Sequence, residues 1–340
     1  MSQAKGELQW ALIGASDIAK TRMIKAINSQ PDSRVTAVFS SNADRVRAYA
    51  AENEIPKAYD TLQGLLDDPQ IDVVYISTTN DLHRDQAFAA AAAGKHILCE
   101  KPIALSVDDA RQMVQRAESA NLVFGTNHHL RNAVTHRTLR KLVKEGAIGK
   151  PLAARVFHAV YLPPRLQGWR LSRPEAGGGV ILDITVHDTD TLRFVLDLEV
   201  EDVIARSASQ GLAQGGIEDA VMGVMYFRDG VLAQFHDAFT IKHASTGLEI
   251  HGTEGSLFAV NVMTQDPVGR IVLRRDSEES EIKLDPPEGL YVHSIRYFNQ
   301  AVRTGTQPFA TGEDGVRSLA VALAAIESAK SGRRMPVLYT

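Results

Sequence analysis

The chain has 340 residues, a length that corresponds to about two domains of roughly 150 residues each. Hydrophobic residues make up 44% and charged residues 23% of the chain, which is typical of a globular protein and excludes a largely disordered or fibrous one. The 37 basic and 41 acidic side chains give a net charge of -4, and no lysine or arginine run forms a basic stripe. Nucleic acid is therefore not an expected partner.

The sequence predicts neither a membrane span nor a secretory signal. Its longest apolar stretch of helical character, residues 87–93, is far shorter than the roughly 18 to 20 residues that a span needs. Residues 1–9 are polar, and the single cysteine, Cys99, cannot form an internal disulfide. We therefore expect a cytoplasmic protein with no membrane partner.

In residues 1–127, short apolar strands alternate with amphipathic helices. The predicted strands are residues 8–14, 35–39, 73–77, 96–99 and 122–125, and the predicted helices are residues 16–28, 43–51, 81–93 and 107–120. Such alternation indicates a parallel sheet covered on both faces. The sequence thus predicts an α/β fold whose N-terminal domain, residues 1–127, is a doubly wound Rossmann sheet.

The rhythm changes in residues 128–340. Helices are predicted at residues 133–144, 180–196, 292–303 and 312–331, and strands at residues 151–161, 200–210, 221–227, 231–239, 248–252 and 271–274. Arg228-Asp229-Gly230 indicates a hairpin between two of these strands. Strands that follow one another through tight turns predict an α+β substrate domain with a large open mixed or antiparallel sheet.

The turn after the first strand is the expected pyrophosphate site. It reads Gly14, Ala15, Ser16, Asp17, Ile18 and Ala19, where a dinucleotide fingerprint has glycine at the first, third and sixth places. Two of the three glycines are missing, but small residues still allow a pyrophosphate to approach the backbone at a helix N-terminus. A tight turn that serves packing alone is the alternative.

The end of the second strand predicts which dinucleotide binds. An acidic residue there would bind the ribose 2′-hydroxyl of NAD, and here Ser40 and Ser41 stand instead, followed by Arg45. Hydroxyls and a guanidinium suit the 2′-phosphate of NADP, so NADPH is the expected cofactor. The alternative is an ordinary exposed arginine on a helix.

Two further motifs predict catalytic groups. Glu100-Lys101-Pro102 follows the strand of residues 96–99, and ligands bind at the carboxyl ends of such strands. Asp183 and His187 are four residues apart on a predicted helix, so the carboxylate would orient the imidazole as an acid or base. We expect Lys101 to donate a hydrogen bond to a carbonyl oxygen.

A metal site is the alternative for these histidines and carboxylates. Asp183, His187 and Asp188, with His128 or His129, offer metal-ligating atoms. We predict that no metal takes part. The segment around His128 is either the wall of a cleft or a polar connection between the domains.

Together these motifs resemble the Gfo/Idh/MocA family of NAD(P)-dependent oxidoreductases over essentially the whole chain. Residues 155–164, 166–170 and 174–179 resemble members that reduce the C2 ketone of 1,5-anhydro-D-fructose to 1,5-anhydro-D-mannitol with NADPH. The resemblance implies this activity, with Lys101 and His187 facing the reacting carbonyl and Asp183 beside them. It also implies that Trp169 and Arg170 help to close the site around the cofactor.

The complete set of expected site residues is larger. Besides the turn, Ser40, Ser41 and Arg45, the cofactor is expected to contact Thr78, Thr79, Asn80, His83, Glu100, Lys101, Asn127, Trp169, Arg170 and Tyr291. The sugar substrate is expected to contact Lys101, His128, His129, Asp183 and His187. The protein is expected to be a monomer or a homo-oligomer that associates through its second sheet.

Three other functions remain open at this stage. The chain could be a dehydrogenase of another sugar or polyol, such as inositol, glucose or a dihydrodiol, because the fold alone does not determine the substrate. It could be an enzyme that retains its dinucleotide and cleaves a glycosidic bond through transient oxidation. It could also be a dinucleotide-binding regulator without activity, although Lys101 and His187 are both present.

Overall fold

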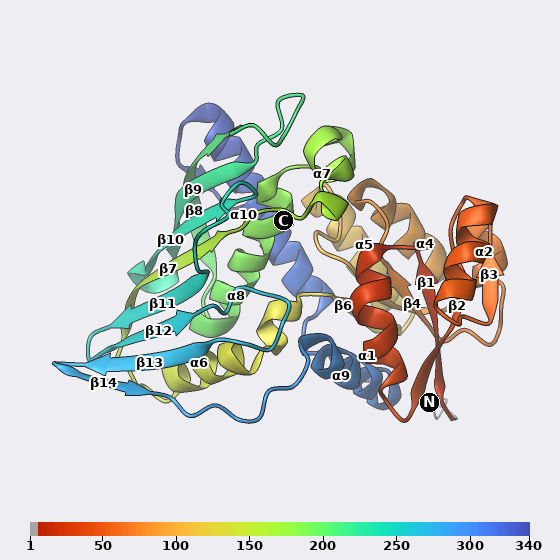
Figure 1. The fold of residues 1–340 in the computed structure, drawn as a ribbon, viewed down its shortest axis with the longest axis horizontal. Helices are drawn as coiled ribbons and strands as arrows, with labels where there is room; N and C mark the ends of the chain where they lie inside the picture. Colours follow the sequence, from red (N-terminus) through yellow and green to blue (C-terminus); the bar gives the residue numbers. More distant parts are fainter. Residues whose placement is uncertain (1–5) are drawn as a thin grey trace. The chain divides into compact units, whose positions relative to one another are not determined.

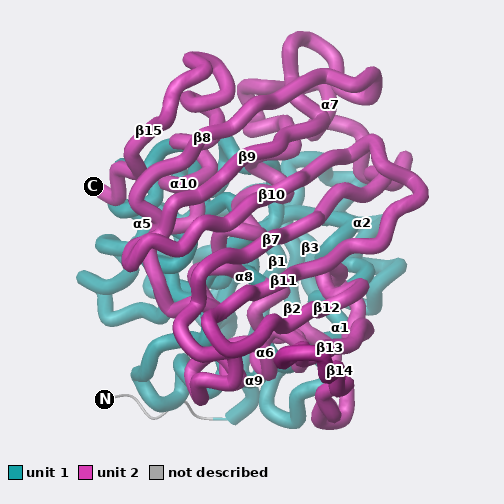
Figure 2. The backbone as a smooth tube through the Cα atoms, turned by 90° about the vertical axis from the view of Figure 1, so that its left-hand side faces the viewer, with its two compact units in different colours: residues 1–128, 291–316 teal, residues 129–290, 317–340 magenta. Residues whose placement is uncertain are grey.

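A computed structural model describes residues 6–340 and divides them into two compact units (Figure 2). Unit 1 contains the residues up to His128 together with Tyr291–Val316, and unit 2 contains His129–Leu290 and Arg317–Thr340. The sequence placed all of residues 128–340 in one domain, whereas the structure packs residues 291–316 within unit 1. Among the described residues, no helix is long and apolar enough to cross a membrane.

Unit 1 contains the doubly wound parallel sheet that the sequence predicts (Figure 1). Its six strands lie in the order β3-β2-β1-β4-β5-β6, and all neighbours are parallel. The strands are β1 (Leu8–Ile13), β2 (Ser33–Phe39), β3 (Lys57–Tyr59), β4 (Val73–Ile76), β5 (His96–Cys99) and β6 (Phe124–Thr126). The sequence missed β3, because three residues are too short for a periodic signal.

Three helices of unit 1, α2, α3 and α5, begin at polar caps. Asn42 accepts a hydrogen bond from the backbone of Arg45 at the start of α2, and Ser106 does the same for α5. The helices are α1 (Ile24–Asn28), α2 (Ala43–Glu52), α3 (Leu62–Leu66), α4 (His83–Ala92), α5 (Val107–Ser119) and α9 (Leu290–Thr304). A π-helical turn, Ala19–Met23, precedes α1 where the sequence predicts one regular helix.

Trp10 explains why α9 packs against the N-terminal sheet. Its ring is fully buried on β1, lies 5.3 Å from the ring of Phe298, and donates a hydrogen bond from Nε1 to Oδ1 of Asn299. Arg303 at the end of the same helix binds the carboxylate of Asp32 at 2.9 Å. These contacts join two distant segments, since Trp10 and Asn299 are 289 residues apart in the chain.

Unit 2 is built on a mixed sheet of nine strands in the order β14-β13-β12-β11-β7-β10-β9-β8-β15. Only the central pair β7 and β10 is parallel, because the other neighbours are antiparallel. The strands are β7 (Pro151–Ala159), β8 (Val200–Ala208), β9 (Ala220–Phe227), β10 (Leu232–Ala238), β11 (Gly247–Gly252), β12 (Ser256–Val260), β13 (Arg270–Arg275), β14 (Glu278–Glu281) and β15 (Met335–Pro336). The predicted open mixed sheet is therefore confirmed.

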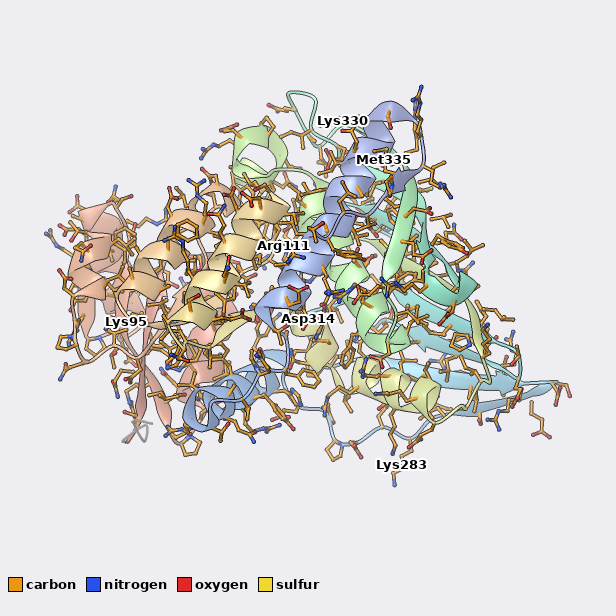
Figure 3. All side chains as sticks on the ribbon, turned by 180° about the vertical axis from the view of Figure 1, so that it is seen from behind. Lys95, Arg111, Lys283, Asp314, Lys330 and Met335 are labelled. Atoms are coloured by element: carbon orange, nitrogen blue, oxygen red, sulfur yellow. The ribbon has the colours of Figure 1, made fainter. Side chains whose placement is uncertain are left out.

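Helices cover one face of this sheet. Figures 1 and 2 show α6 (Val134–Lys144) and α8 (Val186–Leu196) behind the strands, together with part of α10 (Gly312–Ser331). Figure 3 shows Lys330, near the end of α10, close to Met335 of β15. Ser328 of α10 joins these elements, because its hydroxyl accepts from the backbone of Ala205 and donates to the carbonyl of Arg333.

We predict that Phe298 stabilises unit 1 through α9. Replacing Phe298 with Ala should lower the free energy of unfolding by about 3 to 5 kcal/mol, because a fully buried ring is lost beside Trp10. Denaturant unfolding followed by tryptophan fluorescence measures this loss. Gln300→Ala, two residues along on the exposed side of α9, is the control and should change little. Equal effects of the two variants would contradict the predicted packing.

Candidate active site

The turn after β1 is held against the loop after β4. Gly14 has a φ of +110°, and a Cβ there would lie 3.1 Å from Cγ2 of Thr78 and 3.2 Å from the carbonyl oxygen of Ser77. Ser16 contacts the same loop, since its hydroxyl lies 2.8 Å from the hydroxyl of Ser77 and also accepts from the backbone of Ala19. Glycine is thus required at position 14, both by its backbone conformation and by the close approach.

Positive charge lies beside this turn. Arg45 of α2 donates from Nη2 to the carbonyl oxygen of Ala15 at 2.7 Å, and Tyr49 donates to the carbonyl oxygen of Ser16 at 3.0 Å. Burial raises the pKa of Tyr49, so its hydroxyl keeps its proton. Arg45 itself is exposed and can turn towards a ligand. Ser40 is half-buried, whereas Ser41 and Asp17 are exposed and Ile18 is half-buried.

The loop after β4 carries three other expected cofactor residues and is fixed by His83. Thr78 and Thr79 are half-buried and Asn80 is buried. His83 is fully buried, and its two ring nitrogens lie 3.0 Å from the carbonyl oxygen of Pro102 and 3.3 Å from that of Thr78. Burial lowers the pKa of His83 to about 4, so the ring is neutral at pH 7 and its single N–H can donate to only one of the two carbonyl oxygens. The ring packs between the loops that follow β4 and β5.

Glu100 organises the end of β5. Its Oε1 accepts hydrogen bonds from the hydroxyl of Tyr75 and from Nδ2 of Asn127, each at 2.5 Å. Burial raises the pKa of Tyr75 well above its usual value, and the charge of Glu100 and the nearby hydroxyl of Tyr291 raise it further. Lys101 follows directly, half-buried, and its peptide bond to Pro102 is cis. Four expected cofactor residues, Glu100, Lys101, Asn127 and Tyr291, therefore belong to unit 1.

The three glycines before the predicted Asp183 helix each meet a different constraint. Gly177 has a φ of +82°. A Cβ on Gly178 would lie 2.9 Å from the carbonyl oxygen of Arg170, and one on Gly179 would lie 2.3 Å from Oε1 of Glu218. Side chains at these positions would push three elements apart: α7 (Gly168–Ser172), the helical segment that carries Asp183, and the loop that carries Glu218.

Asp183 is held by Arg170, which stacks on Trp169; the sequence predicts that both of these residues lie at the cofactor. Nε of Arg170 donates to Oδ2 of Asp183 at 3.2 Å, and the guanidinium lies 4.7 Å above the ring of Trp169. Both partners of this ion pair keep some exposure, 25% for the Arg170 side chain and 14% for that of Asp183. The structure thus brings Trp169, Arg170 and Asp183 together.

His187 lies on the same helix and contacts His129. Their ring centroids are 4.6 Å apart in an edge-to-face arrangement, and both residues are buried, as is His128. Arg131 fixes the segment of His129 against α8, since Nε donates to Oδ2 of Asp190 at 2.9 Å and a second nitrogen binds the other oxygen. Two expected substrate residues, His129 and His187, are therefore neighbours.

The backbone between Asp183 and His187 differs from the expected regular helix. Residues Ile181–Thr185 form a π-helical turn, in which the backbone N–H of Val186 reaches back five residues to Ile181. Residues four apart are therefore not stacked as in an α-helix. Asp188, the alternative metal ligand, lies 2.7 Å from Nδ1 of His158. Across residues 6–340, no three histidine, cysteine or acidic side chains gather as a metal site.

Glu218 was missed by the sequence reasoning. Its backbone oxygen accepts from the N–H of Val180, and its carboxylate accepts from the N–H of Ile181, so it caps the start of the π-helical turn. Burial raises the pKa of Glu218. One signal pointed to such a group: the helix starts after glycines, with no side chain of its own to cap it.

Comparison with known proteins shows the family. Residues 8–128 match the Gfo/Idh/MocA model described as an oxidoreductase family with an NAD-binding Rossmann fold, and residues 136–258 match the Gfo/Idh/MocA C-terminal domain. The chain belongs to the Gfo/Idh/MocA oxidoreductase family. A dinucleotide-binding fold in unit 1 and the expected fold class follow from this membership.

Relatives within the family match nearly the whole chain. The 1,5-anhydro-D-fructose reductase of Ensifer adhaerens is 56% identical over 96% of this chain and 97% of its own length. The myo-inositol 2-dehydrogenase of Thermotoga maritima is 28% identical over 94% of this chain and 97% of its own length. The solved structure of aldose-aldose oxidoreductase from Caulobacter crescentus superimposes with a TM-score of 0.88 at 25% identity, covering 97% of this chain and 99% of its own.

We predict that Gly178 is required for the contact between α7 and the Asp183 helix. Gly178→Ala should lower the free energy of unfolding by about 1 to 3 kcal/mol, because its Cβ meets three backbone carbonyl oxygens that cannot move independently. Gly168→Ala, where a Cβ meets nothing within 4 Å, is the matched control and should be neutral or slightly stabilising. Urea unfolding of both variants measures the difference, and indistinguishable midpoints would contradict the prediction.

Proposed function

We propose that this chain reduces the C2 ketone of 1,5-anhydro-D-fructose to 1,5-anhydro-D-mannitol with NADPH. The observation that carries the proposal is the 56% identity, over 96% of the chain, to the 1,5-anhydro-D-fructose reductase of Ensifer adhaerens. Identity of this extent covers both family domains and therefore the expected sugar site as well as the dinucleotide fold. A small sugar is accordingly the proposed substrate.

The residues of unit 1 fit a phosphorylated dinucleotide. The turn at Gly14 has no side chain that would fill the close approach between the loops after β1 and β4. Arg45 supplies positive charge at the same turn, and Ser40 and Ser41 place no carboxylate against a 2′-phosphate. These features support NADPH over NADH, with Arg45 binding the 2′-phosphate and the backbone of Ala15 and Ser16 facing the pyrophosphate.

The chemistry of the site then divides between two residues. NADPH supplies the hydride when it is bound. Lys101 and His187 are proposed to act on the carbonyl oxygen, one donating a hydrogen bond to the growing negative charge and the other delivering the proton. Asp183, held by Arg170, is proposed to orient this pair or to bind a sugar hydroxyl. Each role requires only a side chain that the sequence provides.

Cofactor choice is the first test of the proposed function. Arg45→Ala should weaken NADPH binding by about tenfold or more and NADH binding much less, because only NADPH carries the 2′-phosphate that the guanidinium is proposed to bind. Ser40→Asp should shift preference towards NADH by a similar factor. Arg47→Ala is the control, since Arg47 is an exposed arginine on the same helix. The affinities are measured by quenching of tryptophan fluorescence, and unchanged NADPH binding in Arg45→Ala would refute the assignment.

Replacement of the catalytic pair, Lys101 and His187, is the second test of the proposed function. Lys101→Ala and His187→Ala should each lower kcat for 1,5-anhydro-D-fructose by about 100-fold to 10,000-fold with near-normal NADPH affinity. The double variant should be little slower than the slower single variant, because both groups serve one developing charge. Absorbance of NADPH measures the rates.

A substrate panel tests the proposal as a whole. The wild-type protein is assayed with 1,5-anhydro-D-fructose and NADPH, and in the other direction with myo-inositol and NADP or NAD. The second substrate class follows from the 28% identical myo-inositol 2-dehydrogenase. Turnover of myo-inositol with no reduction of 1,5-anhydro-D-fructose would overturn the proposed substrate.

A further inference from the structure

Two aspartates in the interior of unit 2 lie outside the proposed chemistry. Asp188 of α8 and Asp237 of β10 are both fully buried. One oxygen of each has a donor: Oδ1 of Asp188 lies 2.7 Å from Nδ1 of His158, and Oδ2 of Asp237 accepts from the hydroxyl of Thr185 at 2.5 Å. The remaining oxygens, Oδ2 of Asp188 and Oδ1 of Asp237, are buried and have no other donor within residues 6–340.

The two carboxyl groups lie close together, because Asp188 binds His158, the register partner of Asp237 on the neighbouring strand, and each carboxyl group acts on the pKa of the other. Two ionised carboxylates cannot share such a place, because burial and mutual repulsion both oppose the second charge. Burial raises the pKa of Asp188 to about 7, and burial together with the neighbouring Asp188 raises that of Asp237 well above its usual value. Asp237 therefore carries a proton, which it donates to the Asp188 carboxylate.

The result is one continuous hydrogen-bonded chain of four side chains. It runs from His158 through Asp188 and Asp237 to Thr185. His158 and Asp237 are register partners on the parallel strands β7 and β10 at the centre of the nine-stranded sheet. One end of this hydrogen-bonded series is thus anchored at the centre of the sheet of unit 2.

The other end holds the π-helical turn. Thr185 is the last residue of the turn Ile181–Thr185, two residues after Asp183 and two before His187. A π-helical turn is less favourable than an α-helical one and persists where tertiary contacts hold it. The hydroxyl of Thr185 is such a contact, because it binds the turn to β10.

We propose that the hydrogen-bonded series of side chains from His158 to Thr185 positions the candidate catalytic residues. The proton shared by Asp188 and Asp237 holds the π-helical turn in place, and this turn directs Asp183 and His187 to the substrate. The inference rests on the proposed roles of Asp183 and His187. Thr185, Asp188, Asp237 and His158 are positioning residues, because they act through the turn and not on the sugar.

Among the groups around the pair, His158 acts to lower the pKa of Asp237, against the larger effect of burial. His136 of α6 lies behind His158, and burial, with the nearby His158, lowers its pKa to about 3, so it is neutral at pH 7. His158 from β7 is therefore the titratable group that acts on the pair, and Thr185 is the hydroxyl donor from the turn. Loss of the shared proton would leave two charges in the interior with no new partner.

The sign of the pH dependence follows. An acid whose pKa is raised on folding holds its proton more tightly in the folded protein, so its contribution makes folding less favourable as the pH rises from about 4, where the unfolded carboxyl ionises, towards 7. The device is therefore weakest at alkaline pH. Asp237→Asn removes the contribution of Asp237 to this dependence, since the amide always donates to Asp188 and its oxygen still accepts from Thr185.

A matched set of threonine variants tests the tether. Thr185→Val should lower kcat about tenfold with unchanged NADPH affinity, and Thr185→Ser should restore most of the rate, because serine keeps the hydroxyl. Thr191→Val is the control: Thr191 is a fully buried threonine on α8 whose hydroxyl has no hydrogen-bond partner in the described chain. A rate for Thr185→Val equal to that of Thr191→Val, or no rescue by serine, would overturn the proposal.

Asp237→Asn tests the shared proton. Its kcat relative to the wild type should rise by about threefold or more between pH 6 and pH 9, and its melting temperature relative to the wild type should rise over the same range. A buried aspartate with a merely structural role would not change the shape of the pH-rate profile. Superimposable profiles of the wild type and Asp237→Asn would overturn the role of the proton.

Hydrogen exchange separates this inference from the proposed function. In the absence of substrate, Thr185→Val should speed exchange at the backbone amides of residues 181–187 by about tenfold, whereas Thr191→Val should not. Failure of the wild type to reduce 1,5-anhydro-D-fructose would remove the proposed substrate, and the exchange result would still decide the tether. Unchanged exchange in Thr185→Val would overturn the tether, whatever the enzyme reduces.

Discussion

Complete burial of α8 is the constraint on which the organisation of unit 2 depends. Every residue from Val186 to Leu196 is buried, although the helix carries a histidine, two aspartates, two threonines and an arginine. Most polar groups in such a place need hydrogen-bond partners, because an unpaired buried group destabilises the fold. The partners come from separate parts of the chain: His129 for His187, Arg131 for Asp190, and Glu199 for Arg193.

The buried helix follows an irregular turn that carries Asp183, so that Asp183 lies on the turn and His187 on the first turn of α8. A regular α-helix through Asp183 and His187 would place its side chains in a fixed i, i+4 register. The π-helical turn changes this register and directs Asp183 to Arg170 while Thr185 reaches Asp237. Glu218 supports the turn from its beginning, because it accepts from the backbone of Val180 and Ile181. Local irregularity is thus held by several buried contacts.

The site residues of unit 1 are positioned more by close contacts between loops than by buried polar pairs. Gly14 brings the loops after β1 and β4 within contact distance, and His83 joins the loops after β4 and β5. Both contacts lie at the carboxyl ends of parallel strands, where open α/β sheets bind ligands. Glu100 then orients Tyr75 and Asn127 beside Lys101. The residues at this edge therefore hold one another in place.

The sequence determined the features that depend on neighbouring residues. Alternating strands and helices predicted the Rossmann sheet, Arg228-Asp229-Gly230 predicted a turn in which Asp229 and Gly230 both have positive φ, and the motif around Lys101 predicted a strand end. Only the tertiary structure decided the packing of α9 on Trp10, the π-helical turn at Ile181–Thr185 and the contact of Asp188 with Asp237. These join residues tens to hundreds of positions apart, and local periodicity carries no information about which distant side chain will satisfy a buried polar group.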